Sequence, residues 1–211
     1  MNTFTRISIA GLALFVGLGS TGCTTVLTEA AKKTMEDRST ENQVTDTKIG
    51  ANILSGLADK DKSLLLDVNA DVWEERVMLT GTLDDPKVKQ EVVDLVRKDQ
   101  RLRKIYDEIQ SVTKAEKERR REAAKSKDEP RKEGVGQAVN DFWIETKISA
   151  QLITTRGVTS VNYRWRSVRN TVYLIGRARG EEELSTVLDI ILRTDGVSKV
   201  KHFVEIRPVL K

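Results

Sequence analysis

The sequence has very few of the side chains that form disulfides and metal sites. It contains one cysteine, Cys23, and one histidine, His202, among 211 residues. A disulfide within the chain needs two cysteines, and a structural zinc site usually needs four cysteine or histidine ligands. These counts exclude an intramolecular disulfide and argue against a zinc site built from such ligands.

Catalytic motifs are equally scarce. A nucleophilic serine or cysteine needs a base beside it, and His202 has no evident partner in the sequence. His202 falls in the inward phase of a predicted strand, so we expect it to be partly buried. The sequence contains no glycine-rich phosphate loop and no metal motif. We therefore expect a protein that is not an enzyme and that needs no cofactor and no metal.

The sequence also has no strong excess of positive or negative charge. The chain has 36 basic and 32 acidic residues, which leaves a net charge of +4, and only 5% of its residues are aromatic. So mild an excess does not predict a nucleic-acid partner. Beyond the N-terminus no run reaches the roughly 18 apolar residues that a membrane-spanning helix needs. The composition favours a polar body with modest cores.

The N-terminus has the pattern of a secretory signal. Arg6 precedes an apolar run over residues 7–18, and small residues follow at 19–22. The run ends at Cys23, which resembles a bacterial lipoprotein signal, in which the cysteine is acylated and becomes the first residue of the mature chain. Thr24, rather than aspartate, then implies sorting to the outer membrane. A plain signal peptide followed by an incidental cysteine is the alternative.

The rest of the chain contains an internal repeat. Residues 77–81 recur at 172–176, and residues 92–96 recur at 187–191, both at an offset of 95. The tripeptide Thr-Lys-Ile at 47–49 recurs at 146–148, at an offset of 99. The change of offset predicts four extra residues in the first copy, and the polar stretch 58–63 is the natural place for them.

Each copy has the pattern helix, strand, strand, helix, strand. Apolar residues spaced by three or four predict the helices, and alternating apolar residues predict the strands. In the first copy these residues are Ile49, Ile53 and Leu57, then Leu66, Val68, Ala70 and Val72, then Val88, Val92, Leu95 and Val96. In the second copy they are Ile144, Ile148 and Leu152, then Val161, Tyr163 and Trp165, then Leu184, Val187, Leu188 and Ile191.

This order predicts an α+β fold with two α-β-β-α-β domains. The first two strands of each domain should form an antiparallel hairpin, and the second and third should run parallel or be separated by a strand. Both helices should cover one face of each three-stranded mixed sheet. The predicted organisation is a signal peptide at 1–22, a tether at 23–41, domains at 42–113 and 139–208, and a charged linker at 114–138.

The linker has two possible roles. Residues 114–133 contain nine basic and six acidic residues and no large apolar one. A helix should cover the first part, to about Lys127, and end before Pro130 and the glycines that follow. The segment is either a solvated spacer or, through Arg119, Arg120 and Arg121, a contact with anionic lipid headgroups.

Both copies resemble the BON domain family (bacterial OsmY and nodulation). The resemblance rests on the Thr-Lys-Ile helix start in both copies, on the strands that end in Gly81 and Gly176, on the second helix, and on residues 195–197 before the last strand. With the signal, the chain is similar to outer-membrane lipoproteins that carry two BON domains. The resemblance implies a non-enzymatic, lipid-anchored protein that faces the periplasm, binds anionic phospholipid and supports envelope integrity.

The resemblance also implies that lipid binds around the first helix of the second domain, at residues 140–147. The residues themselves favour the same segment. Trp143 points some 140° from the middle of the buried stripe, at about 100° per residue, and tryptophan prefers the membrane interface. Lys147 lies one turn along on the same side, and Phe142 and Thr146 complete the candidate site. Alternatively, the aromatic residues pack against the other domain or the linker, or bind a periplasmic or outer-membrane protein or a second copy of the chain.

Two further groups leave alternatives open. The basic residues Arg164, Arg166, Arg169, Lys199 and Lys201 could form a basic sheet face in the second domain, which is either solvated or binds an anion. Trp73 caps its hairpin or faces the other domain. Trp165, which alternates with Val161 and Tyr163, is expected in the core.

Overall fold

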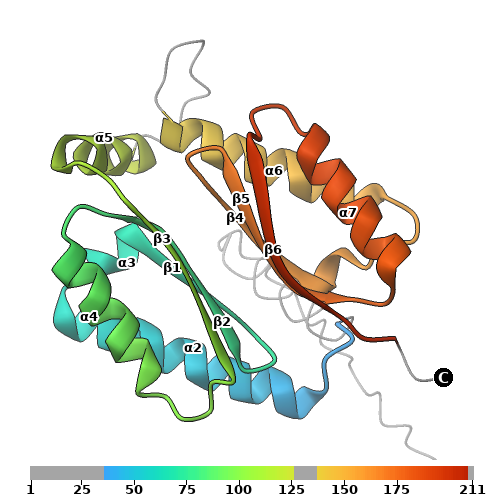
Figure 1. Cartoon of the computed structure of the whole chain (residues 1–211), viewed down its shortest axis with the longest axis horizontal. Coiled ribbons are helices and arrows are strands. Elements are labelled where there is room, and N and C mark those ends of the chain that lie inside the picture. The colour runs from blue at the N-terminus through green and yellow to red at the C-terminus, as the bar shows by residue number, and fades with distance from the viewer. Residues whose placement is uncertain (1–35, 126–136, 209–211) are drawn as a thin grey trace, which may run out of the picture. The chain divides into compact units, whose positions relative to one another are not determined.

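A computed structural model describes residues 36–125 and 137–208 of the chain (Figure 1). The predicted signal peptide, Cys23 and most of the predicted tether lie outside the described residues, as does part of the linker. Residues 35–211 form one compact unit, which is described here by itself. In the described part, no helix is long and apolar enough to cross a membrane.

The compact unit contains two domains with the same order of elements. The first consists of α2 (Thr40–Lys60), α3 (Leu64–Asp67), β1 (Val68–Trp73), β2 (Arg76–Leu83), α4 (Pro86–Arg97) and β3 (Lys104–Ser111). Helix α5 (Lys114–Lys125) follows. The second domain consists of α6 (Gln137–Thr154), the 3-10 turn η1 (Ser160–Asn162), β4 (Tyr163–Val168), β5 (Thr171–Ala178), α7 (Glu181–Arg193) and β6 (Lys199–Ile206).

The predicted fold class is confirmed. Strand β1 pairs antiparallel with β2, and β2 pairs parallel with β3, so the sheet order is β1-β2-β3. The second sheet has the same arrangement, β4-β5-β6. Two helices cover one face of each sheet (Figure 1). In the first domain, Ile49, Ile53 and Leu57 of α2 and Val92 and Val96 of α4 pack on that face.

The first helices are related by an offset of 95, not 99. The buried residues of α2 are Asp46, Ile49, Ile53 and Leu57, and those in the same places on α6 are Asp141, Ile144, Ile148 and Leu152. The predicted four-residue insertion at 58–63 is therefore wrong. The shared Thr-Lys-Ile tripeptide is displaced by one helical turn, which adds four residues to the offset while leaving an isoleucine on the buried face.

A buried aspartate fixes this register in each domain. The Asp46 carboxylate accepts hydrogen bonds from the backbone N–H groups of Glu74 and Glu75, at 2.7 and 2.8 Å. Asp141 accepts equivalent bonds from Arg169 and Asn170, at 2.9 and 3.0 Å. All four donors have positive φ and form the two-residue turns of the hairpins. Residues other than glycine rarely adopt a positive φ. In each domain the carboxylate supplies the hydrogen-bond acceptor for the two backbone N–H groups of such a turn.

The two sheets pack on each other through the faces that the helices leave open. Trp73, Met78, Val168, Tyr173 and Ile175 form a buried cluster there. The rings of Tyr106 and Phe203 stack against this cluster with their centroids 4.0 Å apart. Strand β2 is consequently buried at all eight of its positions.

Contacts in this interface come in pairs related by the repeat. Asp71 and Arg166 occupy equivalent positions 95 residues apart, and they bind each other through two hydrogen bonds of 2.8 and 3.0 Å. The repeat also relates Tyr106 to Lys201 and Glu108 to Phe203, each pair 95 residues apart. The ring contact between Tyr106 and Phe203 therefore corresponds to the ion pair between Lys201 and Glu108, which is 2.5 Å long. The interface therefore has the reciprocal pairing of a two-fold dimer interface, within one chain.

A short strap before α2 spans both domains. The Asp37 carboxylate accepts two hydrogen bonds from Arg179, at 2.7 and 2.9 Å, and these bonds are the main cause of its lowered pKa. The guanidinium of Arg38 lies over the ring of Trp73, 4.0 Å from the centroid. The strap, residues 36–38, and the start of α2 at Thr40 fall within the range predicted as tether.

Two predictions about burial are wrong. Leu66 was expected in the first strand, but it lies in α3 and its exposed fraction is 71%. His202 is exposed rather than partly buried. It lies on β6, which is an edge strand of its sheet, so the strand leaves this side chain open to solvent on one side. Trp165 packs against the second core, as predicted.

Gly81 allows β2 to approach the end of α3 closely. Its φ is +128°, and a Cβ atom placed on it would lie 2.0 Å from the backbone oxygen of Asp67. We predict that Gly81→Ala lowers the free energy of unfolding by about 3 kcal/mol or more, because both the backbone conformation and the contact become strained. Gly180 is the control, since its φ is −171° and it has open space around it.

Urea denaturation of the two variants measures this difference. Gly180→Ala should stay within about 1 kcal/mol of the wild type, which is the scale of a helix-cap effect. Equal losses in the two variants would contradict the close-approach explanation.

Candidate functional site

The outer face of α6 carries the predicted site residues. Asp141, Ile144 and Ile148 are buried and hold the helix on its sheet. The intervening residues Phe142 and Trp143 are 45% and 43% exposed, and their rings meet edge to face at 5.7 Å. The two aromatic side chains are therefore accessible to solvent at the N-terminal part of the helix, as the sequence predicted for Trp143.

The polar members of the site differ in their availability. The Thr146 hydroxyl donates to the carbonyl oxygen of Phe142 at 3.0 Å, so it satisfies its own helix. The Lys147 ammonium lies 3.4 Å from the Asp195 carboxylate, and the two side chains are 47% and 91% exposed. An ion pair this exposed is worth about 0–1 kcal/mol, so it costs little to exchange Asp195 for another anion. Lys147 can therefore serve as a headgroup contact, whereas Thr146 contributes mainly to the helix.

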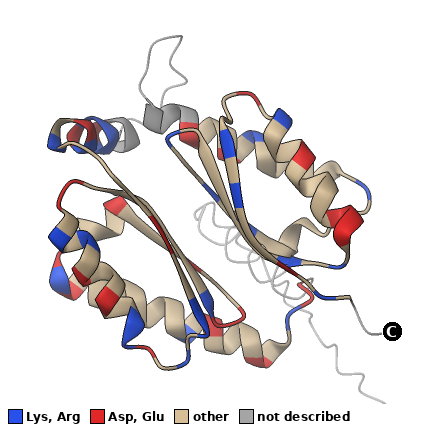
Figure 2. Cartoon of the chain, in the orientation of Figure 1, with Lys and Arg blue, Asp and Glu red and all other residues tan. Residues whose placement is uncertain are grey.

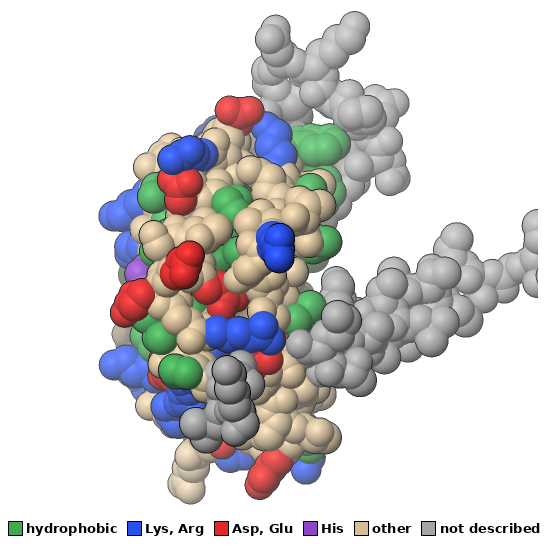
Figure 3. Space-filling model, turned by 90° about the vertical axis from the view of Figure 1, so that its right-hand side faces the viewer, with side chains coloured by type: hydrophobic (Ala, Val, Ile, Leu, Met, Phe, Trp, Pro, Cys, Tyr) green, Lys and Arg blue, Asp and Glu red, His purple; other side chains and the backbone are tan. Residues whose placement is uncertain are grey.

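Ile153 extends this face along the helix, which sequence reasoning missed. It lies 11 residues after Phe142, which is close to three full turns, and it is 64% exposed. Figure 3 shows hydrophobic side chains at several places on this side of the molecule, among charged groups. The signal was present in the sequence, because an apolar residue out of phase with the buried stripe is a candidate for a surface contact.

The face is specific to the second domain. At an offset of 95, α2 has Thr47 and Lys48 where α6 has Phe142 and Trp143. Lys48 is exposed, like the tryptophan it replaces. The two helices share their buried residues and differ on the outer side, so the fold itself does not require the aromatic pair.

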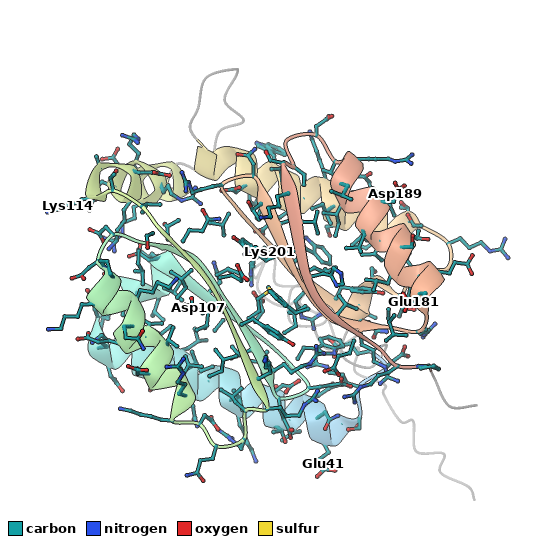
Figure 4. All side chains as sticks on the ribbon, in the orientation of Figure 1. Glu41, Asp107, Lys114, Glu181, Asp189 and Lys201 are labelled. Atoms are coloured by element: carbon teal, nitrogen blue, oxygen red, sulfur yellow. The ribbon has the colours of Figure 1, made fainter. Side chains whose placement is uncertain are left out.

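Most of the predicted basic sheet face is engaged in ion pairs within the chain. Arg166 binds Asp71, and Lys201 binds Glu108, which lies on the facing strand of the first domain. Arg164 likewise pairs with Glu36 of the strap. In Figure 4, Lys201 is labelled on β6, and Figure 2 shows basic residues along the same strand. Arg169 pairs with Glu116 of α5 at 2.9 Å, whereas Lys199 is exposed and has no ion pair among the described residues. Four of the five predicted cations are therefore matched by carboxylates of the same chain, and Lys199 is solvated.

Two of the three linker arginines are also matched internally. Arg120 pairs with Asp141 at 2.9 Å, and Arg121 forms two hydrogen bonds to Asp67, at 2.8 and 2.5 Å. The described part of the linker therefore forms a helix, α5, which is bound to both domains and is not a free spacer. The hypothesis that residues 119–121 contact lipid together loses its support. Of these three arginines, only Arg119 has no ion pair within the described residues.

A concave feature lies in the first domain, away from α6. A cleft of about 440 Å³ lies beside α2 and the end of α4, with Asn52, Gly56 and Leu95 among its lining residues. The guanidinium at its rim, Arg101, is bound to Asp99 at 2.8 and 2.5 Å. In the described part of the chain no three histidine, cysteine, aspartate or glutamate side chains lie together as metal ligands would.

Comparison with known proteins identifies the repeat unit. The family model described as "BON domain" matches residues 45–113 and again 140–208. An uncharacterized protein of Anaplasma centrale, from the gshII 5′ region, is 29% identical over 136 residues, which are 64% of this chain and 79% of that protein. Structures of CdsD, a structural protein of the type III secretion system of Chlamydia trachomatis, and of its C-terminal domain match with 11% and 12% identity. They cover 74% and 72% of this chain and 93% and 96% of theirs, both with TM-scores of 0.29, and at that level they support no statement about this chain.

The Asp71–Arg166 pair gives a direct test of the interface between the domains. We predict that a double-mutant cycle with Asp71→Asn and Arg166→Gln yields a coupling energy of about 1–2 kcal/mol, because the two groups share two hydrogen bonds and Asp71 is buried. The free energy of unfolding in urea is the readout. The control is the exposed pair Asp189–Arg193, whose coupling should stay below about 0.5 kcal/mol. Equal coupling in both pairs would mean that the domains do not dock through this contact.

Proposed function

Because the chain belongs to the BON domain family, we propose that it binds anionic phospholipid at a membrane surface through the outer face of α6. BON domains are known for phospholipid or membrane binding, and the family is non-catalytic in general. The observation that carries the proposal is the exposed aromatic pair, Phe142 and Trp143, one turn from the half-exposed Lys147.

The chemistry of this face suits the interface between water and lipid. A tryptophan ring is apolar with one N–H donor, and it is most stable where one end meets hydrocarbon and the other meets water. Lys147 adds a cation at the level where phosphate groups lie, and each such cation contributes about 1 kcal/mol near an anionic surface. Ile153 adds apolar area farther along the helix. Together these residues form a shallow contact and not a deep pocket.

Weak contact is sufficient if the chain is anchored. We propose that Cys23 carries acyl chains that hold the protein on the periplasmic side of the outer membrane, so that α6 meets the surface at high local concentration. The protein would then support the integrity of the envelope, and its loss would make the outer membrane more permeable. The resemblance of residues 1–23 to a lipoprotein signal supports this part of the proposal.

Co-flotation with liposomes tests the site. We expect residues 24–211, which include the whole described unit, to float with phosphatidylglycerol vesicles and not with phosphatidylcholine vesicles. Trp143→Ala and Lys147→Glu should each reduce flotation at least about fivefold, and added salt should weaken it sharply, because headgroup attraction is screened.

Two matched variants on the first domain serve as controls. Leu54→Ala removes an apolar side chain of α2 that is 49% exposed, and Lys48→Glu reverses an exposed charge on the same helix. Both should float like the wild type. If all four variants floated equally, α6 would not be the binding face; if the wild type floated with neither lipid, a protein partner would replace the membrane in this proposal.

A further inference from the structure

Four arginines converge where the two domains meet, at one end of their strands. Arg76 begins β2 and Arg103 precedes β3 in the first domain, while Arg177 lies on β5 and Arg207 follows β6 in the second. Figure 2 shows basic residues on both domains in this region. These four residues are called the arginine cluster below, and they lie apart from the outer face of α6.

The cluster surrounds two carboxylates. Glu205 lies 3.4 Å from Arg76, 3.3 Å from Arg103 and 2.7 Å from Arg207. Glu74 forms longer ion pairs, of 3.5 Å with Arg177 and 3.7 Å with Arg207. It also lies 4.0 Å from Arg76 of its own domain. One carboxylate from each domain is thus shared among arginines from both.

The positive charge in this region exceeds the negative charge. In the direct ion pairs of the cluster, four guanidinium groups share the two carboxylates of Glu74 and Glu205. Burial acts to raise the pKa of Glu205, but Arg76, Arg103 and Arg207 outweigh it and hold the pKa below its usual value. Arg166 and Asp71, by contrast, pair one to one.

The excess charge is accessible to solvent. Arg76 is 1% exposed and Arg177 is 14% exposed, so both are enclosed, whereas Arg103 and Arg207 are 40% and 44% exposed. Each guanidinium has five N–H donors. Arg103 directs Nε at the carbonyl oxygen of Glu74, at 3.0 Å, and Nη2 at Glu205. Within the described residues its Nη1 group has no partner and remains for a ligand.

We propose that Arg103 and Arg207, one arginine from each domain, bind a phosphate group on the solvent side of Glu205, which lies between their Nη2 groups. The planar fork of a guanidinium matches the oxygens of a phosphate, and charge-assisted bonds of this kind are about twice as strong as neutral ones. The ligand supplies the negative charge that the cluster lacks. Because it is held by both domains, its binding stabilises their docked arrangement.

Thermal unfolding of the full chain in a neutral detergent tests this site. Inorganic phosphate, added at constant ionic strength against sodium chloride, should raise the melting temperature along a saturating curve. In the double variant Arg103→Gln/Arg207→Gln the apparent affinity for phosphate should fall at least about tenfold, as expected for the loss of two charge-assisted contacts.

The control removes two positive charges elsewhere. Arg97 and Arg193 are 60% and 78% exposed and pair only within their own helices, so Arg97→Gln/Arg193→Gln should respond to phosphate like the wild type. An equal response in all three proteins would show an effect of ions in general and overturn the proposal. A wild type that gives no saturable shift with either inorganic phosphate or phosphatidylglycerol in the micelles would overturn it as well. A double variant that is less stable but keeps the phosphate response would assign the cluster a purely structural role, which also overturns it.

A second arm identifies the source of the phosphate. Phosphatidylglycerol mixed into the detergent micelles supplies the same group on a lipid. A shift with inorganic phosphate alone assigns a soluble ligand, and a shift that requires the lipid and is lost in Arg103→Gln/Arg207→Gln assigns a headgroup. The result does not depend on α6, because the same titration with Trp143→Ala should be unchanged even if flotation is abolished.

Discussion

The structure depends on the covering of each sheet by the other domain. A three-stranded sheet with helices on one side only leaves its second face wet, and domains of about 70 residues have little core to spare. Here the second faces cover each other through Trp73, Met78, Tyr173 and their neighbours. Neither sheet is then available for a ligand, so binding is left to the outer sides of the helices and to the edges of the interface.

Electrostatics makes this docking specific. Residues 45–113 contain 11 basic and 14 acidic residues, and residues 140–208 contain 11 basic and eight acidic residues, so the domains carry net charges of −3 and +3. The near-neutral total of the chain conceals this complementarity. The basic face of the second domain meets Asp71 and Glu108 of the first and Glu36 of the strap, so most of its charge is used within the chain.

The sequence predicted what depends on local periodicity and missed what depends on distant pairs. Alternation and helical spacing were sufficient for the elements, the hairpins and the helix-covered faces. The predicted offset of 99 for the first helix was wrong because it followed the repeated Thr-Lys-Ile tripeptide. Asp46 and Asp141 mark the correct offset of 95, but their burial becomes evident only once the turns that they bind are placed. The partners of Arg166 and Arg121 lie 95 and 54 residues away, and no local pattern reports such contacts. The direction of Trp143 was predictable from its phase against Ile144, Ile148 and Leu152. Whether the other domain or the linker covers it was not, and the structure leaves it 43% exposed.

The central claim is that internal docking leaves the aromatic pair on α6 as the surface that meets a membrane, and acrylamide quenching of tryptophan emission tests it most directly. Trp73 is fully buried between the domains, Trp165 packs on the second core, and Trp143 is 43% exposed. The account predicts one readily quenched tryptophan, lost in Trp143→Phe and shielded by phosphatidylglycerol vesicles but not by phosphatidylcholine vesicles. Quenching of Trp143 that anionic vesicles leave unchanged would contradict the claim, and ready quenching of Trp73 would show that the domains do not dock as described.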